Sequence, residues 1–413
     1  MQAIRYNATV PRYFLSKTIG RVAPSLLWSG IASTYSEDVL EPALPGDDWV
    51  VVKTRFGGIC GSDMAMIHSY ATTYYEPLIS MPLTFGHENA GQIASLGSSV
   101  EGWRVGERVV VEPTLWCRPR GIDPECPYCA RGEINRCENF TEGELSPGLY
   151  TGLCADTGGS WSPYFLAHKS QLYRVPDNVN DENALLVEPF ASTLHAVFSN
   201  FPTDDQTVLI IGAGTIGLLT LAALRQLGSK AKIIVSARYP FQVEAANRLD
   251  ADIVISDGDL YSQVADLNGA RIFQPTIGKR VIRGGPDVTF ECAGTDSAID
   301  DAIRITRTGG KVTILGFPGI AKGIDWSALF AQELVVNGSF LYHHVENYQG
   351  SEQPAFTIAL DLFSKGTLDL GWLISHRFKL SEYKSAFRTV SKRKKSKAIK
   401  AVFDFGDSNI ITT

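Results

Sequence analysis

A thiol and an imidazole, two side chains that bind zinc well, lie in the first quarter of this sequence. Cys60 follows an apolar stretch, and His87 comes a short interval later with Glu88 directly behind it. A further acid, Glu188, stands in the run Leu-Val-Glu-Pro-Phe. A lone cysteine or histidine is more often a core residue than a ligand. Three such segments in this order, ahead of a dinucleotide-binding motif, instead predict a metal site.

A second group of possible ligands consists of cysteines alone. Four of the seven cysteines fall close together, at Cys117, Cys126, Cys129 and Cys137. Their Cys-x-x-Cys spacing, without a recognisable export signal, indicates metal binding in a reducing compartment. We expect the remaining Cys154 and Cys292 to be ordinary core or loop residues.

A glycine-rich turn marks a candidate dinucleotide site. It follows an apolar strand expected at 207–211 and opens an apolar helix expected at 216–227, which is the context that the motif requires. Gly212 allows a sharp turn, Gly214 lets the backbone approach a pyrophosphate, and Gly217 lets the helix pack on the strand. The N–H groups of the first helical turn then face the phosphates. The residues assigned to this site are Gly212, Gly214, Thr215, Ile216 and Gly217. The alternative is a glycine turn that binds nothing.

The choice between NAD and NADP depends on the end of the second strand. An NAD site usually places an acid there for the ribose hydroxyls, but this chain has Ser236, Ala237 and Arg238. Without a carboxylate there is no repulsion of a 2′-phosphate, and Arg238 can pair with it bidentately while Ser236 adds a hydrogen bond. The sequence therefore favours NADP. The alternative is that Arg238 is merely solvated and that either cofactor is used.

The order of expected elements divides the chain into two kinds of structure. The first half has short β-type runs broken by Gly and Pro, at 49–55, 91–96 and 108–112. From about residue 184 a helical stretch is followed by alternating strands and helices, as in a parallel sheet covered by helices. These expected elements lie at 207–211, 216–227, 232–236, 241–249, 253–255, 288–291, 297–305 and 311–315. A final strand is expected at 398–405. The sequence predicts an α/β protein in which a mainly β domain is interrupted by a nucleotide-binding domain.

Composition limits the classes of partner. The chain is 44% hydrophobic and 20% charged, as in an ordinary soluble globular protein, and its net charge of −6 argues against a general nucleic-acid partner. It has neither an apolar run long enough to span a bilayer nor a secretory signal at its start. We therefore expect a cytoplasmic protein with a small-molecule partner, no nucleic-acid partner and no membrane partner.

Together these motifs resemble the zinc-containing medium-chain dehydrogenases. The resemblance covers nearly the whole chain and includes Gly102-x-x-Val-Gly106-Glu-Arg108 as well as the segments above. It implies a GroES-like β domain joined to a Rossmann domain. The boundaries that we expect are 1–185 and 336–413 for the catalytic domain, with a zinc lobe at about 115–145, and 186–335 for the Rossmann domain. It also implies an NAD(P)-dependent alcohol or polyol dehydrogenase that forms a homodimer or homotetramer.

The resemblance also assigns roles to individual residues. Cys60 and His87 look like ligands of a catalytic zinc, and Glu88 is a ligand in some members and lies behind the metal in others. Glu188 is similar to the acid of the sorbitol, threonine and glucose dehydrogenase branch, where it binds the metal or holds its water. Ser62 looks like the hydroxyl that removes the substrate proton, and Asp63 like the carboxylate that orients a ligand histidine.

The chain departs from the family pattern in three places. A relay histidine that several relatives have is replaced by Ala65, and His68 is out of register. In the lobe, the expected first cysteine position is Asp123, so either Cys117 or Asp123 completes a four-ligand structural zinc site with the other three cysteines. Residues 13–36 form an insertion, for which we expect an extended hairpin or a loop over the cleft. The basic run at 392–397 is expected to be a solvated helix end.

Two alternatives of other classes remain open from the sequence. One is a zinc-free quinone or enoyl reductase on the same scaffold, and the other is a non-enzymatic protein that keeps the nucleotide fold. The presence of Cys60, His87, Glu88 and Glu188 favours the zinc-dependent oxidoreductase.

Overall fold

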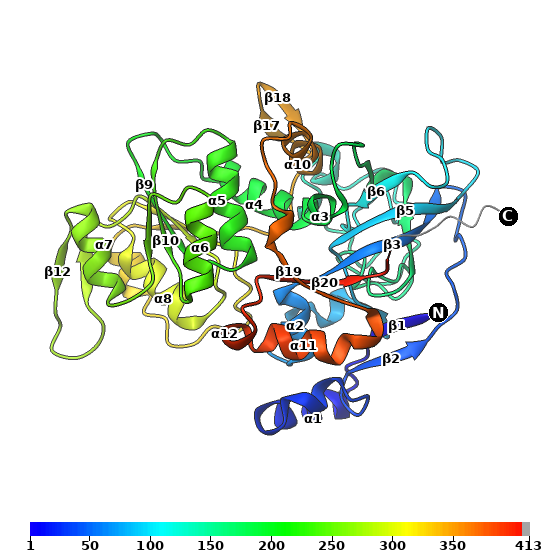
Figure 1. Cartoon of the computed structure of the whole chain (residues 1–413), viewed down its shortest axis with the longest axis horizontal. Coiled ribbons are helices and arrows are strands. Elements are labelled where there is room, and N and C mark those ends of the chain that lie inside the picture. The colour runs from blue at the N-terminus through cyan, green and yellow to red at the C-terminus, as the bar shows by residue number, and fades with distance from the viewer. Residues whose placement is uncertain (407–413) are drawn as a thin grey trace. The chain divides into compact units, whose positions relative to one another are not determined.

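The computed structural model describes residues 1–406, with all side chains except those of Ile19 and Arg21 (Figure 1). The chain forms two compact units. Unit 1 contains Met1–Glu188 and His343–Thr413, and unit 2 contains Pro189–Tyr342. Each unit has its own sheet and its own buried core, so each is described separately.

Unit 1 is built on a mainly antiparallel sheet. Its strand order is β19-β20-β3-β5-β6-β8, and β7 also pairs with β3. The members are β3 (Trp49–Ile59), β5 (Asn89–Leu96), β6 (Arg108–Val111), β7 (Tyr164–His168), β8 (Leu172–Arg174), β19 (Ile374–Phe378) and β20 (Lys400–Asp404). Alternate valines of β3, Val50 and Val52, pack with Ile93, Val109 and Phe165 in one core. Trp49 and Val51 point to the other face and pack with Leu115 and Leu166, so a slip of one residue would move the side chains of β3 into the wrong core.

Smaller elements complete unit 1. A three-stranded sheet has the order β2-β1-β4, and β17 pairs with β18. The strands are β1 (Gln2–Tyr6), β2 (Thr34–Asp38), β4 (Leu83–Thr84), β17 (Glu346–Tyr348) and β18 (Ser351–Gln353). The helices are α1 (Val10–Val22), α2 (Gly61–Ile67), α3 (Asp181–Leu185), α10 (Ala355–Ser364), α11 (Tyr383–Ser391) and α12 (Arg393–Ser396), with a 3-10 turn η1 (Pro24–Trp28) after α1. Further 3-10 turns lie at Thr73–Leu78, Cys129–Arg131, Ile134–Arg136, Lys169–Gln171, Gly371–Leu373 and Leu380–Glu382.

Unit 2 is a parallel sheet flanked by helices. The strand order is β11-β10-β9-β14-β15-β16. The chain builds the sheet outward from β9 in one direction and then in the other, so β9 lies between β10 and β14. The strands are β9 (Thr207–Ile211), β10 (Lys232–Ser236), β11 (Ile253–Ile255), β14 (Val288–Glu291), β15 (Lys311–Ile314) and β16 (Val335–Gly338). The helices are α4 (Val187–Ser199), which begins at the end of unit 1, α5 (Thr215–Gln226), α6 (Pro240–Arg248), α7 (Leu260–Asn268), α8 (Asp296–Ile305) and α9 (Ser327–Ala331). In sheets of this kind a ligand binds at the carboxyl ends of the strands, where the order reverses.

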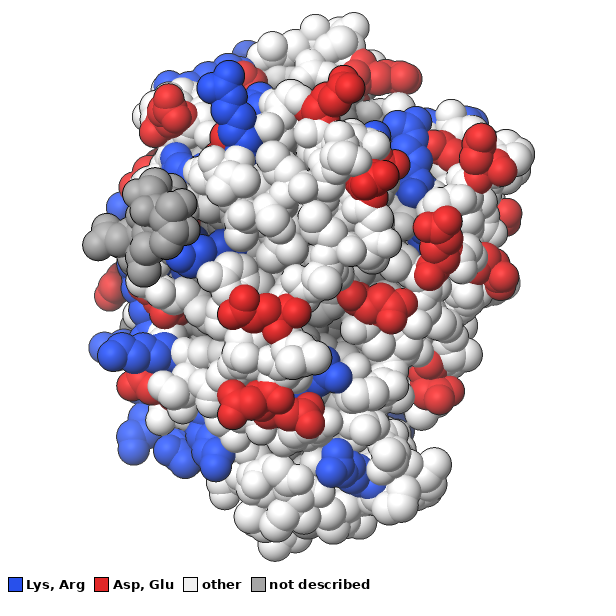
Figure 2. All heavy atoms as spheres, turned by 90° about the vertical axis from the view of Figure 1, so that its right-hand side faces the viewer, with Lys and Arg blue, Asp and Glu red and all other residues white. Residues whose placement is uncertain are grey.

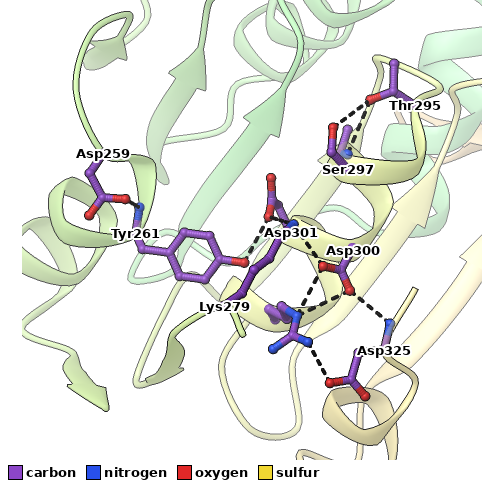
Figure 3. Close-up of polar contacts among 10 residues, drawn as sticks. Asp259, Tyr261, Lys279, Thr295, Ser297, Asp300, Asp301 and Asp325 are labelled. Carbon is purple, nitrogen blue, oxygen red and sulfur yellow. Dashed lines mark hydrogen bonds and ion pairs between the residues drawn. The ribbon is translucent and has the colours of Figure 1, made fainter. Parts of the chain in front are cut away.

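A short hairpin, β12 (Arg271–Phe273) and β13 (Val281–Arg283), is attached to unit 2 by a polar network (Figure 3). Lys279 of the hairpin loop pairs with Asp300 and Asp301 of α8 at 2.8 and 2.7 Å. The hydroxyl of Tyr261 on α7 donates to Asp301 at 2.9 Å. The network therefore joins the hairpin, α7 and α8.

Strands and helices of the nucleotide-binding region lie within one residue of their predicted positions, because each is a continuous apolar run bounded by turn residues. The insertion differs from the prediction. Residues 13–36 were expected to form a hairpin or a loop, but most of them belong to α1 and η1, and only the last three lie in β2. The strand pairing is instead between β2 and β1, with Tyr6 opposite Thr34. Within residues 1–406, no helix is both long enough and apolar enough to cross a membrane.

Candidate metal centres and dinucleotide site

The first candidate metal centre lies where β3 meets α2. Cys60 is the N-cap residue of α2, and His87 and Glu88 directly precede β5, which pairs with β3. The ligand atoms of Cys60, His87 and Glu88 lie within 4.8 Å of one another. His87 and Glu88 are buried, and Cys60 is half-buried. The antiparallel pairing thus brings together the thiol, imidazole and carboxylate that the sequence placed in separate segments.

Asp63 holds two members of this cluster in position. One carboxylate oxygen accepts a hydrogen bond from the backbone N–H of Cys60 at 3.0 Å, and the other lies 3.4 Å from Nδ1 of His87. Burial lowers the pKa of His87, but the charge and hydrogen bond of Asp63 outweigh it and raise that pKa well above its usual value. Asp63 therefore fixes the orientation of the imidazole, which is the role that the family resemblance implied.

Glu88 is neutralised by a lysine from the other end of the chain. Lys400 of β20 forms an ion pair with the carboxylate of Glu88, and both side chains are only 2% exposed. The Lys400 ammonium also donates to the carbonyl of Ile59 at 3.3 Å. Gly58 is required here, because a Cβ at this position would lie within bonding distance of the Glu88 carboxylate. A charge this deeply buried is tolerated only with a paired countercharge.

Glu188 lies beside the cluster but outside its 4.8 Å group. It is in the first turn of α4 and is only 6% exposed. Burial, with a smaller contribution from the nearby Glu88, raises the pKa of Glu188 to about 7 against the opposing effects of His87 and Lys400. Distance therefore favours Glu88 as the oxygen ligand, whereas charge favours Glu188, since Lys400 already neutralises Glu88. Ser62 is half-buried in the first turn of α2.

Two residues of this site were not predicted from the sequence. The ring of Tyr150 lies 5.0 Å from that of His87, and burial raises the pKa of this tyrosine. Lys400 is the second, and a lone lysine inside an expected apolar strand was the signal that could have revealed it. His68 is not a relay residue, as its ring stacks on Tyr70 at 5.5 Å and its Nε2 lies 3.0 Å from the Ser391 hydroxyl.

The donor set fits a catalytic zinc ion. Thiolate sulfur, imidazole nitrogen and carboxylate oxygen are the usual ligands of Zn²⁺, and three protein ligands leave one position open for a substrate oxygen.

The second candidate metal centre consists of Cys117, Cys126, Cys129 and Cys137, all buried, with their sulfur atoms within 4.8 Å of one another. The backbone N–H of Cys126 and the side-chain amide of Asn139 both donate to the sulfur of Cys117, at 3.3 and 3.4 Å. A hydrogen bond from Cys129 lowers the pKa of Cys137 to about 6. Asp123, the alternative fourth ligand, is exposed and lies outside this group. The geometry therefore favours Cys117 over Asp123 in a closed tetrahedral site.

Substitution of Cys117 tests this ligand set. We expect Cys117→Ser to lose one zinc ion per chain and to lower the thermal midpoint, by about 2–4 °C for each kcal/mol of stabilisation lost. Asp123→Ala is the matched control and should keep both its zinc content and its midpoint. Zinc analysis and thermal unfolding measure the two effects. Loss of zinc in the Asp123 variant but not in the Cys117 variant would reverse the assignment.

The glycine-rich turn of unit 2 connects β9 to α5. Gly212 has φ of +101°, and a Cβ there would lie 2.9 Å from the Cβ of Ala293, so only glycine fits both the turn and its neighbour. Gly214 is the N-cap residue of α5, and Thr215, Ile216 and Gly217 form its first turn. The free N–H groups of a twelve-residue helix thus face the carboxyl end of β9.

Ser236 and Arg238 lie at the carboxyl end of β10, next to this turn. The carbonyl of Ser236 accepts a hydrogen bond from the N–H of Gly212 at 3.1 Å. Arg238 is exposed, and its guanidinium lies 5.9 Å from the ring centre of Tyr239. The cationic side chain is thus free to contact a phosphate.

Comparison with known proteins shows the family to which the chain belongs. Residues 46–177 match the model of the alcohol dehydrogenase GroES-like domain, and residues 215–358 match that of the zinc-binding dehydrogenases. A sorbitol dehydrogenase of Bombyx mori is 30% identical over 347 residues, which cover 82% of this chain and 87% of that protein. An L-threonine 3-dehydrogenase of Aeromonas salmonicida is 28% identical over 366 residues, covering 88% and 95% of the two chains.

Solved structures show the same fold. The 2R,3R-butanediol dehydrogenase of Bacillus subtilis superposes with a TM-score of 0.72 at 24% identity, covering 98% of this chain and 99% of that one. A dehydrogenase of unknown specificity from Escherichia coli gives a TM-score of 0.73 at 25% identity and covers 91% and 96% of the two chains.

Proposed function

Since this chain belongs to the zinc-containing medium-chain alcohol dehydrogenases and is an oxidoreductase acting on CH–OH groups, we propose that it oxidises a polyol, a sugar or an amino alcohol with a zinc ion bound at Cys60 and His87. The observation that carries this proposal is the buried group of Cys60, His87 and Glu88, with Glu188 beside it. Unit 1 supplies this metal centre, and unit 2 supplies the dinucleotide site.

Each residue of the metal centre would have its own role in the reaction. Zinc, when bound, supplies a Lewis acid that makes a hydroxyl more acidic. Ser62 would take the hydroxyl proton, and a bound nicotinamide would supply the acceptor for the hydride of the carbinol carbon, so that the product would be a ketone, an aldehyde or a lactone. Asp63 orients the imidazole of His87 by contacting its Nδ1 at 3.4 Å, so that this ring would be held ready to bind the metal. Lys400 supplies a countercharge to the buried carboxylate of Glu88.

The substrate class follows from the acid at Glu188 and from the relatives. The similar proteins include dehydrogenases of L-threonine and sorbitol and a D-xylulose reductase, whose substrates carry a second polar group next to the reacting carbinol. An initial-rate screen with polyols, aldoses, threonine and simple secondary alcohols tests the proposal. We expect at least one substrate with adjacent polar groups to exceed every simple alcohol in kcat/KM, and a preference for simple alcohols would contradict it.

We propose NADP as the preferred cofactor. A charge-assisted contact to the 2′-phosphate is worth about 1.5–3 kcal/mol, so Arg238→Ala should lower kcat/KM for NADP about tenfold to a hundredfold and leave NAD nearly unchanged. Ser236→Asp should lower kcat/KM for NADP further, because the new carboxylate repels the 2′-phosphate. Initial rates with each cofactor provide the measurement. Equal losses with NAD and NADP would show that Arg238 does not select the cofactor.

We further propose a homodimer or homotetramer joined through the free edge of β16. Among the described residues, β16 pairs only with β15, and the nearby Phe330, Val335 and Trp326 are 87%, 55% and 54% exposed. A strand with one unpaired edge and apolar side chains beside it is a suitable site for pairing with a second copy. We expect Val335→Lys to reduce the molar mass measured by light scattering to that of a smaller oligomer, and an unchanged mass would exclude this edge. None of the seven cysteines, all of which lie within residues 1–406, forms a disulfide, and this supports the proposed cytoplasmic location.

A further inference from the structure

The inserted helix α1 presents an apolar outer face that the rest of unit 1 does not cover. Val10, Phe14 and Val22 are 71%, 62% and 88% exposed. Val10 and Phe14 are about one turn apart, Val22 lies further round the same side, and the exposed Lys17 and Thr18 lie between them. The opposite side is packed, with Ser16 fully buried and its hydroxyl 3.4 Å from that of Ser33. This helix precedes residue 46, where the match to the GroES-like domain begins, so the family core does not require it.

A row of cations lies on the neighbouring helices. Lys384, Arg388 and Lys392 follow one another at intervals of four residues, which places them on one face of α11 and its end. The buried residues Ala386, Phe387 and Val390 form the opposite face. The exposed cations of this segment are Lys384, Arg388, Lys392, Lys394, Lys395 and Lys397. Over residues 1–406 none of the six has an acidic partner, and residues 383–403 contain no acid.

The two surfaces belong to one packed assembly. Trp28, at the end of η1, contacts the ring of Phe387 on α11 with ring centres 5.8 Å apart. The hydroxyl of Tyr383 donates to the carbonyl of Trp28 at 3.3 Å. Figure 1 shows α1 directly below α11, with α12 following at the end of α11, and Figure 2 shows Lys and Arg side chains but no acids on the lowest part of another face of the molecule. We call the exposed residues of α1 and the six cations the basic–apolar face.

We propose that the basic–apolar face binds the surface of a membrane that contains anionic phospholipids. Apolar side chains on the outside of a helix enter the boundary between headgroups and acyl chains, while clustered lysines and arginines are attracted to anionic headgroups. The six positive charges of the basic–apolar face contrast with the whole chain, which carries a net charge of −6. A nucleic acid would account for the cations but not for the exposed Phe14 and Val22.

This inference departs from the expectation that the protein has no membrane partner. That expectation rested on the absence of a spanning segment, and a helix that lies on the surface needs no such segment. The apolar residues and the cations are far apart in the sequence, so only the folded chain shows that they belong together.

Vesicle co-sedimentation tests the proposal with the full-length, zinc-loaded protein. The probes are vesicles of phosphatidylcholine alone and vesicles of phosphatidylcholine mixed with phosphatidylglycerol. We expect binding only to the anionic vesicles, reduced by added salt. Lys392→Glu with Lys395→Glu should weaken binding at least tenfold, and Phe14→Ser should weaken it severalfold. The matched control, Lys230→Glu with Lys311→Glu, changes the net charge equally on unit 2 and should bind as the unmodified protein does.

Several results would overturn the proposal. One is failure of the unmodified protein to bind anionic vesicles, and another is equal loss of binding in the control pair. Binding of duplex DNA that depends on Lys392 and Lys395, without vesicle binding, would assign the cations to a nucleic acid. A change in oligomer mass caused by Phe14→Ser would assign the apolar side of the face to a second copy of the chain. Dehydrogenase activity should stay unchanged in every variant, which separates these effects from misfolding.

Discussion

Cys60→Ser is expected to lower kcat/KM by about a thousandfold or more. A Lewis-acid metal contributes several kcal/mol to the stabilisation of developing charge, and each 1.4 kcal/mol is about a factor of ten in rate. Serine is a poor zinc ligand, and His87 with one carboxylate cannot hold the ion alone. Zinc analysis should show one ion fewer per chain, and initial rates with the best substrate of the screen give the loss of activity.

Cys154→Ser is the control for this substitution. Cys154 is also buried in unit 1, but its thiol donates to the carbonyl of Ser146 at 3.4 Å, a contact that serine can keep. This variant should retain both the zinc content and the activity. Equal activity of the Cys60 variant and the unmodified protein would remove the metal from the mechanism.

Lys400→Met is expected to destabilise the protein by about 3–5 kcal/mol, because removing one partner leaves the buried Glu88 carboxylate without a countercharge. Methionine has nearly the same length as lysine, so the loss of stability measures the effect of removing the charge and not the effect of opening a cavity. Urea unfolding followed by fluorescence measures the effect, and we expect a lower midpoint. The two units can unfold separately, so the transition to compare is the one that the substitution shifts.

The double variant Lys400→Met with Glu88→Gln separates charge from packing. Removing both charges should restore most of the lost stability, since a neutral amide is far cheaper to bury than an unpaired carboxylate. A double variant no more stable than Lys400→Met alone would show that the lysine matters for packing and not as the counterion of Glu88.

Much of the fold and of the chemistry could be predicted from the sequence. The strand at 207–211 and the glycine turn were visible because an apolar run, a turn and an apolar helix follow in a fixed order. Cys60 and His87 were recognisable because thiols and imidazoles are rare enough to stand out. The structure adds that pairing of β3 with β5 brings their segments together, with Asp63 contacting both.

Other features depend on contacts between distant segments. The pairing of Lys400 with Glu88 joins the last strand to the loop before β5, and nothing in the local sequence of either residue specifies it. Tyr150 comes from a loop after the cysteine-rich lobe, where it forms an isolated β-bridge with Thr114. The helix α1 has few of the usual signals, because it lacks an acid in its first turn and contains Gly20. Its apolar outer face also obscures the alternation of buried and exposed residues on which helix prediction depends.

The central claim is that zinc held at Cys60 and His87 is required for hydride transfer to a nicotinamide cofactor. The most direct measurement follows the absorbance of the reduced nicotinamide with the best substrate, before and after dialysis against a chelator and after return of Zn²⁺. We expect dialysis to abolish cofactor reduction and added zinc to restore it. Undiminished reduction in zinc-free protein would contradict the claim and indicate a zinc-independent reductase, and zinc-loaded protein without activity toward any substrate would indicate a binding protein instead.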